Sequence, residues 1–80
     1  MEFRLPELGE DAGSLAKVTF WYVSAGDAIE KDQPIVEMMT DKATFDVESP
    51  VRGRIAEILV KEDETAAVGD VLCAIEPAES

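Results

Sequence analysis

The stretch EMMTDKATFD, Glu37–Asp46, contains two short apolar runs on either side of a turn that carries one lysine, Lys42. In the second run Ala43, Phe45 and Val47 alternate with polar residues, as in a strand that buries one face. The turn TDKA lacks the Asn-Gly or Gly-X pair of the usual two-residue hairpins, so negative φ angles and a type I turn are predicted at its centre. The stretch therefore predicts a β-hairpin with Lys42 at its tip.

Apolar runs of similar length recur along the chain and are rich in β-branched and aromatic residues. Turn formers such as AGD, KDQP, SPVRG and VGD separate them, and no stretch between the turns is long enough for a helix of ordinary length. The runs are AKVTFWYV (16–23), PIVEMM (34–39), ATFDVE (43–48), RIAEILV (54–60) and DVLCAIE (70–76). The pattern predicts an all-β domain of about eight short strands.

The second half of the chain repeats the apolar pattern of the first. A shift of 37 positions without gaps lays Val18 on Ile55 and Ile35 on Leu72. In both copies the leading apolar residues are spaced i, i+3, i+5, and this break in the period of two predicts a β-bulge at the same place in each copy. We therefore expect a flattened barrel or sandwich of two four-stranded antiparallel sheets with two-fold pseudo-symmetry. In that arrangement Lys42 lies at the end opposite the chain termini.

Charge and composition exclude several classes of function. The chain has 80 residues, of which 18 are acidic and 7 are basic, and a net charge of −11. An acidic surface repels nucleic acid and anionic membranes, so neither is expected as a partner. The chain has no histidine and one cysteine, which excludes histidine-based triads, an internal disulfide and the usual zinc sites. No metal site is expected, and Cys73 in its apolar run is predicted to be a core residue.

The chain is expected to form one domain over residues 1–76, followed at 77–80 by the start of a Pro/Ala-type linker. No run is long enough to span a membrane and no signal peptide precedes the first strand, so a soluble intracellular domain is expected. A chain of this size buries only about 60% of its unfolded surface, which leaves little room for a complete enzyme active site.

The sequence around Lys42 leaves two interpretations of this lysine open. A solvated lysine ammonium is protonated at neutral pH and is a poor nucleophile, and the sequence offers no neighbouring base. Lys42 could be an unmodified surface residue. Alternatively, an enzyme that recognises the hairpin tip could acylate it, which would remove its charge and add a long flexible arm.

MTDKAT (39–44) resembles the lipoylation motif of the lipoyl domains of 2-oxo acid dehydrogenase complexes, in which Asp-Lys-Ala surrounds the modified lysine. Other motifs of that family are matched by LPELGE (5–10), WYVSAGDAIEKDQPIVE (21–37), ESPVRGRI (48–55) and VGDVLCAIE (68–76). The likeness covers nearly the whole chain and keeps the spacing of these motifs.

The resemblance implies that lipoic acid is joined covalently to Lys42 through its ε-amino group. Asp41 and Ala43 would then be recognised by the attaching enzyme and by the decarboxylase, while also serving as a turn former and a small inward-facing strand residue. Thr40 would serve either the structure of the turn or recognition.

The first loop, EDAGSLAK (10–17), departs from the EGxxEGxV found in many relatives. In the family this loop lies beside the modified lysine and helps partner enzymes to choose their domain. Glu10 and Asp11 are therefore candidate recognition residues by resemblance, and their divergence leaves the choice of 2-oxo acid complex open.

The resemblance implies a non-catalytic carrier domain of a dihydrolipoamide acyltransferase, in which a separate domain transfers the acyl group to coenzyme A. The expected partners are a thiamin-dependent 2-oxo acid decarboxylase, the acyltransferase catalytic domain, dihydrolipoamide dehydrogenase and the lipoate-attaching enzyme. A tethered arm would visit each active site at high effective concentration. The isolated domain is expected to be monomeric, in the cytoplasm of a bacterium or archaeon or in the mitochondrial matrix of a eukaryote.

Two alternative functions remain. A biotinyl carrier domain has a similar fold and also modifies a hairpin lysine, but that family places methionine on both sides of the lysine, where this chain has Asp41 and Ala43. The other alternative is an acidic β-module that binds a protein partner while Lys42 stays unmodified. The intact mass of the protein separates these three functions.

Overall fold

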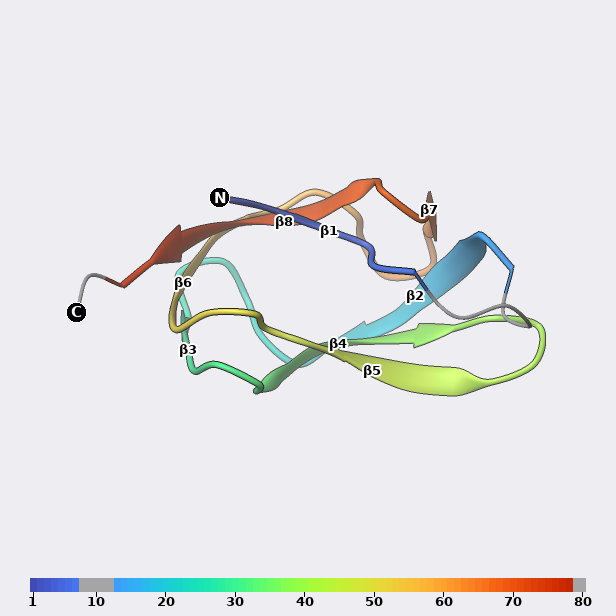
Figure 1. Ribbon diagram of the computed structural model, residues 1–80, viewed down its shortest axis with the longest axis horizontal. Coiled ribbons are helices and arrows are strands. Elements are labelled where there is room, and N and C mark those ends of the chain that lie inside the picture. The colour runs from blue at the N-terminus through green and yellow to red at the C-terminus, as the bar shows by residue number, and fades with distance from the viewer. Residues whose placement is uncertain (8–12, 79–80) are drawn as a thin grey trace.

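The computed structural model describes residues 1–7 and 13–78, and these residues form eight strands. The predicted all-β fold is therefore confirmed (Figure 1). The strands are β1 (Glu2–Arg4), β2 (Leu15–Trp21), β3 (Ala28–Ile29), β4 (Pro34–Met39), β5 (Thr44–Glu48), β6 (Gly53–Ile58), β7 (Thr65–Ala67) and β8 (Val71–Pro77). No helix among the described residues is long and apolar enough to cross a membrane.

Two antiparallel sheets of four strands each face one another, as the sequence predicts. The hairpin sheet has the order β5-β4-β2-β7, and the terminal sheet has the order β1-β8-β6-β3. The inward side chains of both sheets form one core, in which Val18, Ile35, Met38, Ile55 and Leu72 are completely buried. Burial of such apolar surface, at roughly 25 cal/mol per Å², is the main favourable contribution to the stability of this small domain.

The two sheets are related by the sequence shift of 37 positions. The shift relates β2, β3 and β4 to β6, β7 and β8, so β4-β2-β7 of the hairpin sheet corresponds to β8-β6-β3 of the terminal sheet. The edge strands β5 and β1 take equivalent places in the two sheets but are not related by this shift. The register of β2 on β4 slips between Val18 and Phe20, and the register of β6 on β8 slips between Ile55 and Glu57. The predicted bulge is thus present at equivalent places in both copies.

The turns of the two copies are also equivalent. Gly26 (φ 96°) corresponds to Asp63 (φ 73°), and Asp32 (φ 68°) corresponds to Gly69 (φ 92°). Each copy therefore places one glycine and one aspartate in the left-handed region, where glycine is unstrained and aspartate is tolerated at a small cost. The backbone follows the same path in both copies although the residues differ. The pseudo-symmetry is therefore present in the backbone as well as in the pattern of apolar residues.

Cys73 of β8 lies in the core, as predicted, with 0% of its surface exposed. Burial disfavours the thiolate and raises the pKa of Cys73 to about 11. At neutral pH this residue is an unreactive apolar side chain, so it offers no nucleophile for chemistry.

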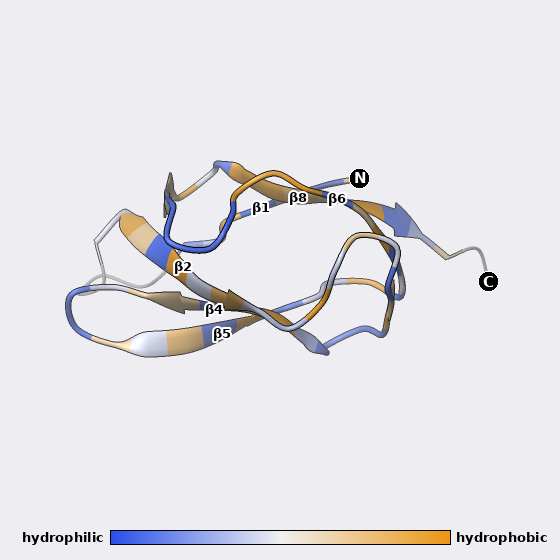
Figure 2. Cartoon of the chain, turned by 180° about the vertical axis from the view of Figure 1, so that it is seen from behind, coloured by the Kyte–Doolittle hydropathy of each residue, from blue (hydrophilic) through white to orange (hydrophobic). Residues whose placement is uncertain are grey.

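The β4–β5 connection lies at one end of the long axis of the molecule, and the C-terminal end of β8 lies at the other (Figure 1). The molecule measures 37 × 22 × 17 Å, so these two ends are separated by most of its length. Met1 lies toward the β8 end, where its carbonyl oxygen accepts a hydrogen bond from the Ile75 amide (2.8 Å). Hydrophilic residues form the tip of the β4–β5 connection (Figure 2). The described chain ends therefore lie away from Lys42, as the pseudo-symmetry predicts.

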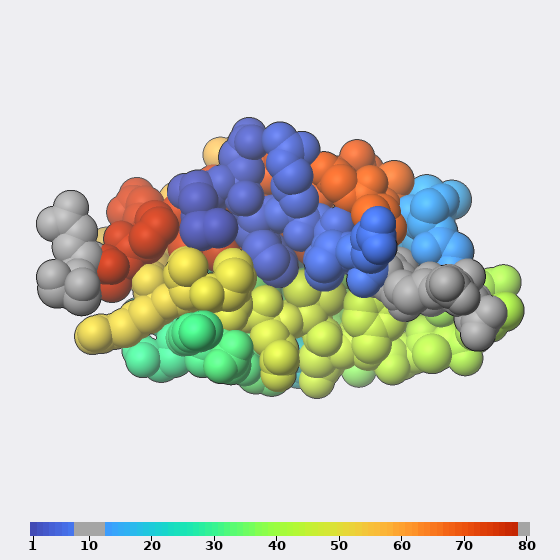
Figure 3. Space-filling view, in the orientation of Figure 1, coloured from blue at the N-terminus to red at the C-terminus, as the bar shows by residue number. Residues whose placement is uncertain are grey.

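The edge strands β1 and β5 belong to different sheets, and their segments meet on one face of the molecule (Figure 3). A groove of about 520 Å³ runs between them, lined by Phe3, Phe45 and Pro50 among other residues. The groove therefore lies where the edges of the two sheets meet.

Candidate functional site

Lys42 lies in the connection Thr40–Ala43, between the last residue of β4 and the first residue of β5. The Thr40 amide donates to the Ala43 carbonyl oxygen at 2.8 Å and closes the hairpin. Among the described residues that are not glycine, only Asp32 and Asp63 have a positive φ. Asp41 and Lys42 therefore keep negative φ angles, which excludes the I′ and II′ turns and agrees with the predicted turn.

The Thr40 side chain holds this turn together. Its hydroxyl oxygen accepts hydrogen bonds from the amides of Lys42 and Ala43, both at 3.2 Å, and its hydroxyl donates to the Ala43 carbonyl oxygen at 3.3 Å. Hydrogen bonds from a threonine side chain to the backbone stabilise a turn, and here they do so in a turn that lacks the usual Asn-Gly or Gly-X pair. Thr40 is also only 9% exposed. Thr40 thus stabilises the turn, and little of its surface is exposed for contact with another protein.

The three residues Asp41, Lys42 and Ala43 are all exposed. The Lys42 ammonium group makes no hydrogen bond or ion pair with any described residue. The prediction that Ala43 faces inward is wrong: it lies outside β5, and the hairpin extends beyond the strands of the terminal sheet, so no strand of that sheet covers it (Figure 1). Phe45 and Val47 do turn toward the core, as predicted.

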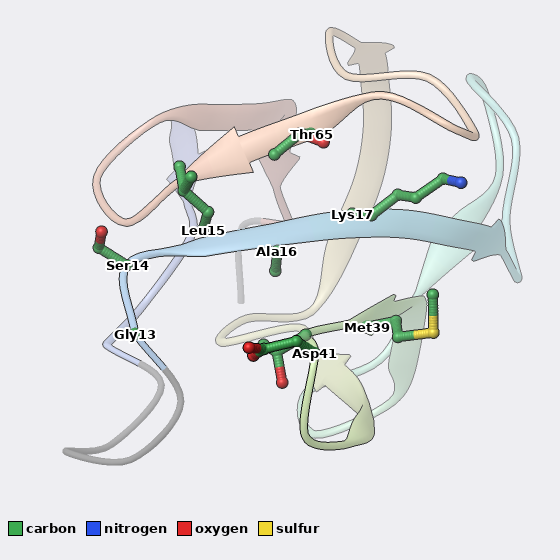
Figure 4. Close-up of a pocket in the computed structure, with 9 residues that line it drawn as sticks. Gly13, Ser14, Leu15, Ala16, Lys17, Met39, Asp41 and Thr65 are labelled. Carbon is green, nitrogen blue, oxygen red and sulfur yellow. The ribbon is translucent and has the colours of Figure 1, made fainter.

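A shallow depression of about 370 Å³ lies between the tip of the hairpin and β2. In Figure 4, Asp41 and Met39 lie on one side of it and β2 lies on the other, with Gly13 and Ser14 at one end. Its lining is Gly13, Ser14, Leu15, Ala16, Lys17, Met39, Thr40, Asp41 and Thr65. Asp41 therefore shares a surface with the residues that follow the first loop.

The candidate recognition residues Glu10 and Asp11 lie outside the described residues. Their neighbours in sequence, Gly13 and Ser14, lie at the depression beside Asp41. The alternation of apolar residues contained no signal for this approach, which depends on how β2 packs beside β4, but the family resemblance did imply it for the first loop.

The described residues contain no group of three or more His, Cys, Asp and Glu side chains that could hold a metal ion. Near Lys42 they provide one carboxylate, Asp41, and no activated nucleophile. The arrangement can display an amine at the end of a rigid hairpin, but any bond formation at that amine requires groups from another protein.

Comparison with known proteins identifies the family. A family model described as "Biotin-requiring enzyme", with the name Biotin_lipoyl, matches residues 1–75. The chain belongs to the Biotin_lipoyl family. This finding agrees with the family resemblance in the sequence.

Two curated Biotin_lipoyl relatives narrow the comparison. The chain is 41% identical over 75 residues to the dihydrolipoyllysine-residue acetyltransferase component of the pyruvate dehydrogenase complex, both from Staphylococcus aureus and from Staphylococcus epidermidis. The match covers 94% of this chain and 17% of each relative. The chain thus corresponds to about one sixth of the length of these acetyltransferase components.

A solved structure of a lipoyl domain also resembles the chain. The lipoyl domain of the 2-oxoglutarate dehydrogenase complex from Azotobacter vinelandii superposes on the chain with a TM-score of 0.75 and 29% sequence identity. The match covers 96% of this chain and 98% of that domain. Within the Biotin_lipoyl family, these relatives support the function of a lipoyl carrier domain for this chain.

One feature of this Biotin_lipoyl chain was not predicted from its sequence. Phe20, Tyr22 and Met39 are large apolar side chains on the outer side of the hairpin sheet, with 50%, 45% and 41% of their surface exposed. The bulge at Thr19 reverses the alternation along β2, which is the signal that could have identified Phe20 as an outward residue.

Proposed function

We propose that Lys42 carries lipoic acid in amide linkage and that the domain is a mobile acyl carrier of a 2-oxo acid dehydrogenase complex. The observation that carries this proposal is the exposed Lys42 at the tip of the β4–β5 hairpin, flanked by Asp41 and Ala43, far from the end of β8. The relatives named above include the acetyltransferase component of one such complex and a lipoyl domain of another.

The residues around Lys42 fit a covalently attached arm. The ε-amino group is exposed and makes no ion pair with the described residues, so neither burial nor an ion pair opposes formation of an amide. Amide formation joins Nζ to the lipoate carboxyl carbon with net loss of water, and the attaching enzyme supplies activation of that carboxyl. When attached, the dithiolane would supply the acyl acceptor and the redox couple.

The chain's own residues position the arm. Thr40 fixes the turn through three hydrogen bonds, which directs Lys42 away from the core. Asp41 and Ala43 flank the lysine as exposed residues that an attaching enzyme and a decarboxylase can contact. A linker that follows β8 would hold the domain at the opposite end and allow Lys42 to reach several active sites.

The proposed partners are a thiamin-dependent decarboxylase, the acyltransferase catalytic domain, dihydrolipoamide dehydrogenase and the lipoate-attaching enzyme. In this proposal the domain of residues 1–76 performs no catalysis itself, and acyl transfer to coenzyme A takes place on the catalytic domain. The Staphylococcus relatives are bacterial, which favours the bacterial cytoplasm as the compartment.

The test is the intact mass of the protein after incubation with a purified lipoate-attaching enzyme, ATP and lipoate, and in parallel with a biotin-attaching enzyme, ATP and biotin. We expect the mass of one lipoyl group, located at Lys42 by peptide mapping, and no biotinyl adduct. A biotinyl adduct alone would support the biotinyl carrier, and the absence of both adducts would support an unmodified protein-binding module.

The complex that is served is tested separately. The lipoylated domain is supplied to purified pyruvate and 2-oxoglutarate decarboxylases with their substrates, and the rate of acylation of the domain is measured by mass. The identity to the acetyltransferase components favours pyruvate. Faster acylation with 2-oxoglutarate would assign the domain to the complex named for the Azotobacter structure.

A further inference from the structure

The pseudo-symmetry supplies an internal reference for the outer surfaces of the two sheets. On the hairpin sheet three outward positions hold the large apolar residues Phe20, Tyr22 and Met39. The shift of 37 positions places Glu57, Leu59 and Glu76 at the equivalent positions of the terminal sheet, and all three are exposed. Because the terminal sheet folds with carboxylates at two of these positions, the fold itself does not require apolar side chains there.

Two of these apolar residues, Phe20 and Tyr22, form an ordered cluster. The rings of Phe20 and Tyr22 meet edge to face with their centroids 5.4 Å apart. The Tyr22 hydroxyl donates to Asp46 Oδ1 at 2.8 Å, which anchors the ring toward β5. Exposed aromatic side chains that are held in one position lose little conformational entropy when a partner covers them, so they suit a binding surface.

Two carboxylates lie beside this cluster. Glu37 of β4 is paired directly with Phe20 of β2 and with Asp46 of β5, so the three residues form one row across the sheet. The Thr19 hydroxyl donates to Glu37 Oε2 at 2.7 Å and holds that carboxylate in place. Phe20 and Tyr22 are therefore flanked by positioned negative charges, which are complementary to apolar side chains accompanied by arginine or lysine.

Met39 lies on the same outer side of the sheet, nearer to the modification site than the aromatic pair. Met39 is the last residue of β4 and precedes Lys42 by three positions, and it also lines the depression beside Asp41. An enzyme that forms a bond at Lys42 Nζ must bring its active site to the tip of a lysine side chain, so its surface must cover the adjacent strands. The enzyme must also distinguish Lys42 from the other lysines of the chain. The turn residues alone offer only a small contact area for this recognition.

We propose that the outer surface formed by Phe20, Tyr22 and Met39 is the docking surface of the lipoate-attaching enzyme, and that the enzyme contacts it with apolar side chains surrounded by arginine or lysine. This inference rests on the proposed function, and it extends recognition from the turn to the outside of the hairpin sheet. A second copy of the chain is disfavoured as the occupant, because two surfaces that carry Glu37 and Asp46 on molecules of net charge −11 repel each other.

The test replaces the outer residues of the hairpin sheet by those of the terminal sheet. The triple variant Phe20→Glu, Tyr22→Leu and Met39→Glu is compared with the wild type in lipoate attachment, followed by intact mass over a range of domain concentrations. We expect the KM for the domain to rise at least about tenfold, equivalent to about 1.4 kcal/mol, with kcat within about twofold, because the chemistry at Lys42 is unchanged. The control variant Leu59→Glu, on the terminal sheet, should keep the wild-type KM within about twofold.

A second measurement uses variants that remove no apolar surface. In the double variant Glu37→Gln and Asp46→Asn, KM should rise and should depend less on NaCl concentration than KM of the wild type, because exposed charges are screened by salt. A structural role of these carboxylates would not change the salt dependence. Circular dichroism and thermal unfolding establish that each variant is folded.

The outcomes are distinguishable. If the wild type is lipoylated at Lys42 while both sets of variants keep its KM and salt dependence, the docking surface is refuted and the carrier function stands. If the triple variant is unfolded, the double variant decides. If the wild type is never lipoylated, the carrier function fails and the docking proposal fails with it.

Discussion

The two copies of the repeat, residues 15–39 and 52–76, have the same backbone and different surfaces. Both contain the bulge at the same place, and both bury apolar side chains at equivalent inward positions, such as Ile35 and Leu72. Only the first copy continues into the hairpin with Lys42, and only its sheet carries Phe20 and Tyr22 on the outside. The comparison shows that packing constrains the inside of both copies, whereas their outer surfaces differ, and the outer surface of the first copy is the one for which docking is proposed.

The largest difference between the copies is the hairpin lysine itself. Lys42→Ala should abolish lipoylation completely, because no other amine occupies the tip, and should change the free energy of unfolding by less than about 0.5 kcal/mol, because the position is exposed. Intact mass and thermal unfolding measure the two effects. Residual single lipoylation of the variant, or a marked loss of folded structure, would contradict the placement of Lys42.

Gly53 differs from its counterpart in the first copy because its Cα lies close to a neighbouring backbone atom. Gly53 of β6 corresponds to Ala16 of β2, yet a Cβ atom at Gly53 would lie 2.2 Å from the Glu76 carbonyl oxygen, a backbone atom with little freedom to move. Gly53→Ala should therefore destabilise the domain by about 2 to 4 kcal/mol in urea or guanidinium unfolding. The matched variant Ala16→Gly should lower the free energy of unfolding by only about 1 kcal/mol. It removes one methyl group and increases the backbone entropy of the unfolded chain. Equal losses in the two variants would refute the close approach at Gly53.

Cys73 corresponds to Val36, and this difference predicts a dependence on pH. The folded state keeps the proton on Cys73 up to its pKa of about 11, whereas the unfolded chain loses it near the ordinary value of 9.0. Between these values the unfolded state binds fewer protons, so stability falls as pH rises.

Cys73→Val should remove this contribution, which amounts to about 2 kcal/mol near pH 11. The measurement is the unfolding free energy of wild type and variant from pH 8 to 11, compared as a difference so that other groups cancel. Tyr22, whose hydrogen bond to Asp46 raises its pKa to about 12, titrates in both proteins and cancels as well. Parallel curves would show that the thiol does not titrate differently in the folded state.

The smallest expected effect concerns the turns. Asp63 adopts φ 73°, where its equivalent Gly26 adopts φ 96°. Asp63→Gly should stabilise the domain by about 0.5 kcal/mol, because relief of the left-handed conformation slightly exceeds the loss of the exposed 3.7 Å ion pair with Lys17. Gly26→Asp should destabilise by a similar amount. Thermal unfolding of both variants measures the difference, and effects of the same sign would refute the equivalence of the two turns.

Much of the fold was predictable because strand signals are local. PIVEMM was predicted at the limits of β4, and the irregular spacing of apolar residues located both bulges. The hairpin tip and the negative φ angles of Asp41 and Lys42 followed from the residues of the turn alone. The inward orientation of Ala43 was predicted incorrectly, because alternation gives the direction of a side chain but not whether an opposing sheet extends far enough to cover it.

The sequence by itself determined an all-β chain with an internal repeat and one lysine at a hairpin tip, because alternation and turn chemistry involve residues close together in the chain. The tertiary structure alone decided that Phe20 and Tyr22 form one surface with Asp46, and it brought Asp41 beside Gly13 and Ser14, which the residue pattern did not predict and only the family resemblance implied. These contacts join β2, β4 and β5 and the residues before β2, and they exist only after distant segments have become neighbours. The physical reason is that strand pairing, and not the local pattern, selects which outward side chains share a surface.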